Sequence, residues 1–172
     1  MGTFTDPRDG KTYKTVTIGK QTWLAENLKY EASSSKYYDN NPANGQKYGR
    51  LYDWETAKKA CPTGWHLPSI NEWQELVNFA GGDEVAGKKL KATSGWVENG
   101  NGTDEYGFAA LPAGSYGYSG RFYGIGNVSY GWSSTEDDAT KAYIRHMFSH
   151  TATVGKGSYN KSDLFPVRCV QD

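Results

Sequence analysis

The second half of the sequence alternates short apolar and aromatic pieces with clusters of glycine, asparagine and serine, and this alternation constrains the fold most. Five such pieces follow Gly95, at residues 108–111, 122–125, 130–133, 142–148 and 165–170. Short pieces separated by turn-forming residues are typical of strands in an antiparallel, loop-rich sheet. We therefore expect the chain after Gly95 to form such a sheet.

The N-terminal part predicts a hairpin and a long loop. After a turn at residues 6–11, apolar and polar residues alternate over residues 12–18, which indicates a strand. A tight turn follows, and residues 21–25 form the second strand of the hairpin. Residues 33–48 are polar and contain Asn-Pro and Asn-Gly steps, which indicate a loop.

Two helices are expected next. Apolar residues recur on one face from about residue 53 to residue 60, before Pro62. Ser69 and Glu72 have the spacing of a capping box, which predicts a helix that begins there and ends at residues 81–82. A short third helix is expected at residues 85–90. The order of strands, helices and strands indicates an α+β fold, with two main helices packed on a mostly antiparallel sheet.

The sequence of 172 residues predicts a single domain over residues 4–172, with no internal repeat or linker. Residues 1–3 have no basic or apolar leader character, and we expect any natural export signal to have been trimmed from this sequence. The 19 Lys and Arg residues balance 19 Asp and Glu residues, which argues against a nucleic-acid partner. No apolar run reaches the roughly 18 residues that a membrane span needs.

Nothing in the sequence points to catalysis. It has no nucleophile elbow, zinc-binding helix or phosphate-binding loop. His66 stands between apolar neighbours and is expected to be packed, while His146 and His150 are too far apart on a strand to share a metal ion. We expect no cofactor, with one weak calcium candidate in the loop that contains Asn99, Asn101 and Asp104, and a weaker one at residues 136–138.

Cys61 and Cys169 are the two cysteines. Their separation excludes a CxxC redox or zinc motif, but both could be free and buried, or they could be joined. A bridge would close a loop that the chain-entropy model values at about 4–5 kcal/mol. It would also indicate a location outside the reducing cytosol.

The chain is rich in residues that make good binding surfaces, with 13 tyrosines, 6 tryptophans and 21 glycines. Tyrosine with serine, glycine and asparagine is the mixture of antibody paratopes. A central series of rings interleaved with glycine and serine comprises Tyr116, Tyr118, Phe122, Tyr123, Tyr130 and Trp132. Exposed rings stack on sugars or anchor protein interfaces, and we expect Phe122 and Trp132 to lie inside instead.

Eight blocks of sequence resemble the Fibrobacter succinogenes major paralogous domain family over residues 4–172. The blocks are residues 6–13, 21–28, 49–52, 61–68, 106–108, 110–112, 132–136 and 167–170. The resemblance implies a C-type-lectin-like fold of the formylglycine-generating-enzyme type and a Cys61–Cys169 disulfide. It also implies secreted or surface-anchored proteins of Bacteroidetes and Fibrobacteres. It brings no established catalytic activity, and the sugar-selecting triplets of calcium-dependent lectins are missing.

Departures from the family pattern concentrate in the last third, where Ile144, His146, Phe148 and His150 alternate and would share one strand face. Members of this family are among the targets of diversity-generating retroelements, so we hypothesise a variable ligand site there; ordinary drift is the alternative. The expected ligand-binding residues are Tyr116, Tyr118, Arg121, Tyr123, Tyr130, Ile144, His146, Phe148, His150 and Tyr159.

The function expected from the sequence is therefore an extracellular receptor or adhesin module, with a protein as its ligand. A carbohydrate-binding module of a polysaccharide-utilising system is the alternative. An enzyme derived from the same fold is a remote third.

Overall fold

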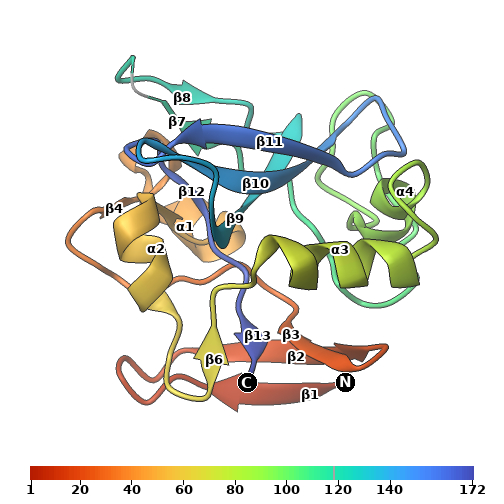
Figure 1. The fold of residues 1–172 in the computed structure, drawn as a ribbon, viewed down its shortest axis with the longest axis horizontal. Coiled ribbons are helices and arrows are strands. Elements are labelled where there is room, and N and C mark those ends of the chain that lie inside the picture. Colours follow the sequence, from red (N-terminus) through yellow and green to blue (C-terminus); the bar gives the residue numbers. More distant parts are fainter. Residues whose placement is uncertain (118) are drawn as a thin grey trace.

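A computed structural model gives the fold and describes residues 1–117 and 119–172. It is an α+β arrangement, and both chain ends belong to one five-stranded sheet (Figure 1). In spatial order that sheet comprises β1 (Gly2–Thr5), β2 (Thr12–Ile18), β3 (Gln21–Leu24), β13 (Val170–Gln171) and β6 (Trp65–His66). Strand β1 includes Gly2 and Thr3, which the sequence placed before the domain.

The remaining strands form three smaller sheets. The largest contains, in spatial order, β11 (Gly155–Asn160), β10 (Lys141–Phe148) and β9 (Val128–Glu136). The other two contain β12 (Phe165–Pro166), β5 (Leu51–Tyr52) and β4 (Ser35–Lys36), and the hairpin of β7 (Ser115–Tyr116) and β8 (Phe122–Tyr123). Every pairing of these strands across the described residues is antiparallel, as expected.

Three of the helices were predicted. Helix α2 (Trp54–Ala60) begins after Asp53, whose side chain accepts a hydrogen bond from the Thr56 amide. Helix α3 (Ile70–Phe79) has the predicted capping box of Ser69 and Glu72. Helix α4 (Ala86–Leu90) is the short third one. Within the described residues, no helix has both the length and the apolar character that crossing a membrane requires.

The prediction that residues 33–48 form a loop is wrong. This segment contains β4, a 3-10 turn η1 (Tyr38–Asn40) and helix α1 (Pro42–Tyr48). The Asn41 side chain caps the helix by accepting a hydrogen bond from the Ala43 amide, and Pro42 occupies the first helical position. The Asn-Pro step that indicated a loop is therefore a helix start, because proline needs no amide partner there.

Three predicted strands are shorter than expected. Residues 108–111 contribute only one bridge, at Ala110, because Ala109 adopts a left-handed conformation with φ of 52°. Residues 122–125 stop pairing at Tyr123, before Gly124 with φ of 81°. Residues 165–170 divide into β12 and β13, which belong to different sheets.

Aromatic side chains form much of the core. Trp54 of α2 donates its indole N–H to the Ser133 carbonyl at 2.8 Å, and Trp73 of α3 donates to the Trp132 carbonyl at 3.2 Å. Trp132 itself is fully buried and donates to the Tyr52 carbonyl at 2.7 Å. Both main helices are therefore attached to strand β9 through buried indole groups.

Arg168 is a buried cation at the start of the last strand. Its side chain is 3% exposed, and Nε donates to the Asn27 side-chain oxygen at 3.1 Å. Nη1 donates to the carbonyls of Leu24 and Phe108. Burial lowers the pKa of the guanidinium to about 10. These bonds attach the C-terminal segment to β3 and to the long loop before β7.

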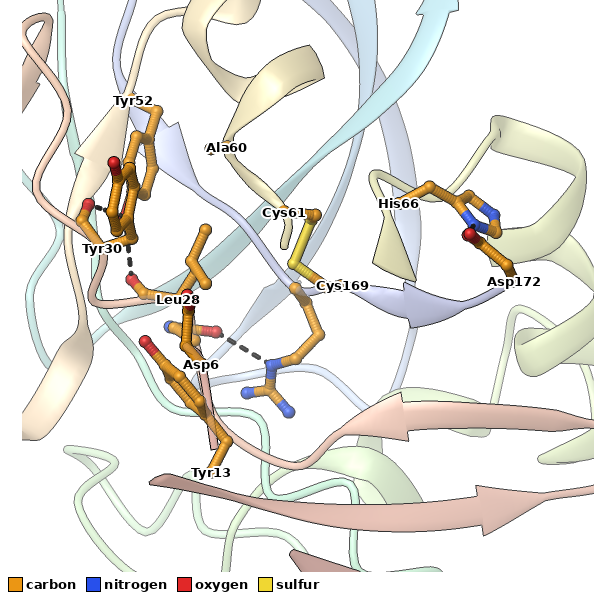
Figure 2. Close-up of a disulfide and its surroundings, with 12 residues drawn as sticks. Asp6, Tyr13, Leu28, Tyr30, Tyr52, Ala60, Cys61, His66, Cys169 and Asp172 are labelled. Atoms are coloured by element: carbon orange, nitrogen blue, oxygen red, sulfur yellow. Dashed lines mark hydrogen bonds and ion pairs between the residues drawn. A yellow bond between two sulfur atoms is a disulfide. The ribbon is translucent and has the colours of Figure 1, made fainter. Parts of the chain in front are cut away.

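The next residue forms the disulfide. Cys169 is joined to Cys61 at the end of α2, across 108 residues of sequence. Figure 2 shows this bridge near Tyr13 and Tyr52, and the Tyr52 hydroxyl donates to the Tyr30 carbonyl at 2.6 Å. The pairing implied by the family resemblance is confirmed.

His66 is held by carboxylates rather than enclosed by apolar neighbours. Nδ1 lies 2.6 Å from an Asp172 carboxylate oxygen (Figure 2). Nε2 lies 2.8 Å from Glu72, and the His66 side chain is 39% exposed. Burial lowers the pKa of His66. The hydrogen bonds with Asp172 and Glu72 raise it, and together they outweigh the effect of burial, so the pKa lies above its ordinary value. His66 therefore links β6 and α3 to Asp172, and the two carboxylates favour its charged form.

We expect the double substitution Cys61→Ala and Cys169→Ala to lower the free energy of unfolding by about 4 kcal/mol, because the unfolded chain regains the entropy of a large loop. Urea unfolding at neutral pH measures the difference. A loss below about 1 kcal/mol would show that the disulfide contributes little to the stability of the fold.

We expect His66→Gln to lower the melting temperature more at about pH 5.5 than at about pH 9. The stabilisation from charged His66 is present below its ordinary pKa and is lost as the pH rises through its higher folded-state pKa. Thermal unfolding of both proteins across this range measures the effect. An equal loss at both pH values would contradict a charged link.

Candidate ligand-binding site

The sheet of β9, β10 and β11 has one face directed at helix α3. Met147 of β10 packs in the same cluster as Trp73, and Arg145 bonds to Gln74 and Asp83. Alternation along the strand places His146 and Phe148 on the opposite face, where both are partly exposed. This second face is the one on which the sequence predicted a ligand site.

Five rings follow one another across that face. Between ring centroids, Tyr159 lies 6.1 Å from Tyr130, Tyr130 lies 6.4 Å from His146, His146 lies 4.8 Å from Phe148, and Phe148 lies 5.7 Å from His150. We call this set the aromatic ridge. Four predicted site residues of β9, β10 and β11, together with His150 after β10, therefore form a continuous series of ring contacts.

One end of the ridge borders a pocket of about 410 Å³, here called the tyrosine pocket. Its aromatic rings come from four strands, β8, β9, β11 and β12, which belong to three sheets. The lining residues are Ser115, Gly117, Ser119, Tyr123, Tyr130, Tyr159, Asp163 and Phe165. Three tyrosines that the sequence singled out, far apart along the chain, therefore surround one hollow.

Ile144 does not reach this surface, which corrects the sequence prediction. It is fully buried, because it lies opposite Trp132 in the β9–β10 register and belongs to the same core cluster. His150 is exposed but follows the end of β10 at Phe148, so it lies in the next turn rather than on the strand.

The other predicted residues lie around the β7–β8 hairpin. Tyr116 packs against Phe122 at 4.8 Å, with Lys36 over its ring at 5.4 Å, and it lines a neighbouring hollow. Phe122 is only partly buried. Arg121 is exposed in the turn of the hairpin, and Tyr118 lies outside the described residues.

Five lining residues were missed by sequence reasoning: the small residues Ser115, Gly117 and Ser119, and the larger Asp163 and Phe165. Phe165 was assigned to a strand, and it also lines the pocket, with its ring centroid 4.8 Å from that of Tyr130 and 5.3 Å from that of Tyr159. Asp163 lies in the turn before β12 and is only 6% exposed. A single acidic residue in a polar turn has no sequence pattern that would have identified it.

His146 is the most constrained residue of the ridge. It pairs with Gly155 across β10 and β11, and a Cβ on Gly155 would come within 2.0 Å of the imidazole. Nδ1 is buried with no hydrogen-bond partner in the described chain. Burial, and then the charge of Arg145, lower the pKa of His146. The ring is therefore neutral at physiological pH and behaves as an aromatic wall.

The calcium candidates have other partners in the structure. The Asn101 side chain accepts from the Trp96 amide, and Asp104 accepts from the Ala109 amide. The Lys88 ammonium donates a hydrogen bond to the backbone carbonyl of Asn101 at 2.8 Å. Over the described residues, no group of three His, Cys, Asp or Glu side chains is arranged to hold a metal ion.

Comparison with known proteins gives one match. The family model described as the Fibrobacter succinogenes major domain matches residues 16–171. No curated protein and no solved structure matches the chain. The matched range includes both cysteines, α2, α3 and every strand from β3 to β13. The chain belongs to the Fibrobacter succinogenes major domain family.

Proposed function

We propose that this protein is an extracellular binding domain that recognises another protein through the aromatic ridge and the tyrosine pocket. The observation that carries the proposal is the joining of these two features into one partly exposed aromatic surface. Rings with few rotatable bonds give a large contact area at a low entropic cost, which is why they dominate protein interfaces.

The position of the surface supports display. In Figure 1 both chain ends lie on the five-stranded sheet at the bottom, while β7, β8 and β11 lie at the top. A domain attached through either end would therefore present β7, β8 and β11 away from its attachment point. The disulfide is compatible with the secreted or surface-anchored location that we propose.

Three finer points belong to the same proposal. The scaffold is C-type-lectin-like, its role is non-enzymatic, and a retroelement diversifies the ridge. One feature favours the last point: Phe148 and His150 of the ridge, and Tyr123 of the pocket, are at least partly exposed and belong to neither of the two main core clusters, although Tyr130 and Tyr159 pack against one of them.

A carbohydrate ligand is the second candidate. The tyrosine pocket combines rings with the hydroxyl groups of Ser115, Ser119 and Tyr123, and the last two share a hydrogen bond of 3.0 Å. Rings with nearby hydroxyl groups suit stacking on a sugar. A sugar would occupy the pocket alone, whereas a protein ligand would also contact Phe148 and His150 on the ridge.

We expect the triple variant Tyr123→Ser, Phe148→Ser and Tyr159→Ser to lose at least about tenfold in affinity for a protein ligand, since hot-spot rings each contribute more than about 1 kcal/mol. The purified domain is screened on arrays of extracellular proteins and of glycans, and hits are measured by calorimetry. The matched control is Phe79→Ser with Val85→Ser, which removes exposed apolar groups elsewhere.

The proposal is supported if the triple variant no longer binds a protein ligand that the parent and the control variant both bind. Equal retention by the triple variant, or equal loss in the control, places the interface elsewhere. Glycan hits without protein hits establish the carbohydrate alternative.

A further inference from the structure

Strand β11 is an outer strand of its sheet, and one of its edges has no paired strand among the described residues. The Lys161 amide donates to the Thr140 carbonyl at 2.9 Å, one pair beyond the last pair of the β10–β11 register. Hydrogen-bonded pairs alternate with non-bonded pairs in an antiparallel ladder. Counting back along β11 from that bond, the backbone N–H and C=O groups of Lys156 and Ser158 point away from β10.

The opposite edge of the same sheet, formed by β9, is covered. The Val128 carbonyl accepts from the Gly114 amide at 3.0 Å, and the Trp132 and Ser133 carbonyls accept the indole bonds from α3 and α2. Within the part of the chain that the structure describes, the outward backbone groups of β11 have no such partners. The open edge of this sheet is therefore that of β11, and it is available to a strand from another molecule.

The aromatic ridge reaches this open edge. A Cβ on Gly155 would overlap the imidazole of His146, and a Cβ on Gly157 would lie 2.8 Å from the ring of Tyr159. Both rings therefore lie over glycines of β11, on the face that carries the ridge. A strand added beside β11 would have every second side chain on that face, next to these two rings.

We propose that an extended segment of the protein ligand pairs with β11 as an additional strand of this sheet. Main-chain hydrogen bonds to Lys156 and Ser158 bind the segment, and its alternate side chains contact His146 and Tyr159. In this mode of recognition the backbone bonds supply affinity, and the alternate side chains supply specificity. The inference rests on the proposed function and names the form in which the ligand binds.

The chemistry of the edge favours a strand from a different protein. Lys156 is exposed there, and its ammonium lies over the Tyr143 ring at 5.2 Å. A lysine on an edge strand discourages pairing between copies of the same chain, whereas a ligand strand can place an acidic or neutral side chain beside it. A glycan has no row of alternating N–H and C=O groups with which to extend the sheet.

The test selects peptides from a displayed library of random nonapeptides without proline, with the intact domain as bait. Two methylated forms of each selected peptide are then made, one N-methylated at alternate odd residues and the other at alternate even residues. In an extended strand only one of these two sets of N–H groups faces β11. We expect one form to bind at least about tenfold more weakly than the parent peptide and the other to stay within about threefold.

Hydrogen exchange measured by NMR locates the pairing on the domain. The amides of Lys156 and Ser158 should exchange rapidly in the free domain and at least about tenfold more slowly when the peptide is bound. The amides of Gly157 and Tyr159 face β10 and should be protected in both states, so they serve as an internal control.

A pair of substitutions tests the same edge. Lys156→Pro removes an outward N–H group and no bond to β10, so we expect at least about a tenfold loss of peptide affinity. Lys156→Ala is the matched control, because it removes the charge and keeps the N–H group, and its affinity should stay within about threefold of the parent. If Lys156→Pro fails to fold, the methylated peptides and the exchange rates decide.

Selection of no peptide, equal binding by the two methylated forms, or unchanged exchange at Lys156 and Ser158 would overturn strand pairing. Dimerisation of the domain that Lys156→Pro abolishes would assign the edge to a second copy and would also overturn it. Failure of this inference is distinguishable from failure of the proposed function. A protein ligand that the triple variant loses but Lys156→Pro binds as the parent does retains the function and removes only the strand pairing.

Discussion

The buried guanidinium of Arg168 is the constraint on which the arrangement of the fold depends. A cation in the core needs an acceptor for its N–H groups, because each unpaired polar group there costs free energy. Here the acceptors are the Leu24 and Phe108 carbonyls and the Asn27 side chain, which come from distant parts of the sequence. Cys169 follows directly and is joined to the end of α2. Two adjacent residues therefore fix the last strand against both halves of the chain.

The buried groups that hold the fold together are largely separate from the surface that we propose for recognition. Trp54 and Trp73 attach the two main helices to β9 through indole hydrogen bonds to backbone carbonyls, and Trp132 attaches β9 to β5 in the same way. The ridge lies on the outer part of the same small sheet, and its side chains are partly exposed. Backbone positions are thus set by buried groups, while Tyr123, Phe148 and His150 mainly determine the character of the surface. Such a division suits a domain whose ligand specificity changes while its fold does not.

Local patterns predicted the local structure well. The capping box of Ser69 and Glu72, the β2–β3 hairpin and the alternation along β10 all depend on neighbouring residues, and the structure contains each of them. Prediction failed where distant contacts decide. The division of residues 165–170 into two strands accompanies the inward turn of Arg168, and the burial of Ile144 follows from its place opposite Trp132. The tyrosine pocket was foreseen only as separate tyrosines, because its walls come from four strands.

The most direct test of this division is a saturation library at Tyr123, Phe148, His150 and Arg168, sorted on cells by resistance of the displayed domain to protease. We expect most substitutions at the first three positions to keep resistance near that of the parent, since surface changes usually alter stability by less than about 0.5 kcal/mol. We expect nearly every substitution at Arg168 to lose resistance. Equal intolerance at Tyr123, Phe148 and His150 would show that these ridge and pocket residues are needed for stability, and it would contradict the proposed separation of recognition from stability.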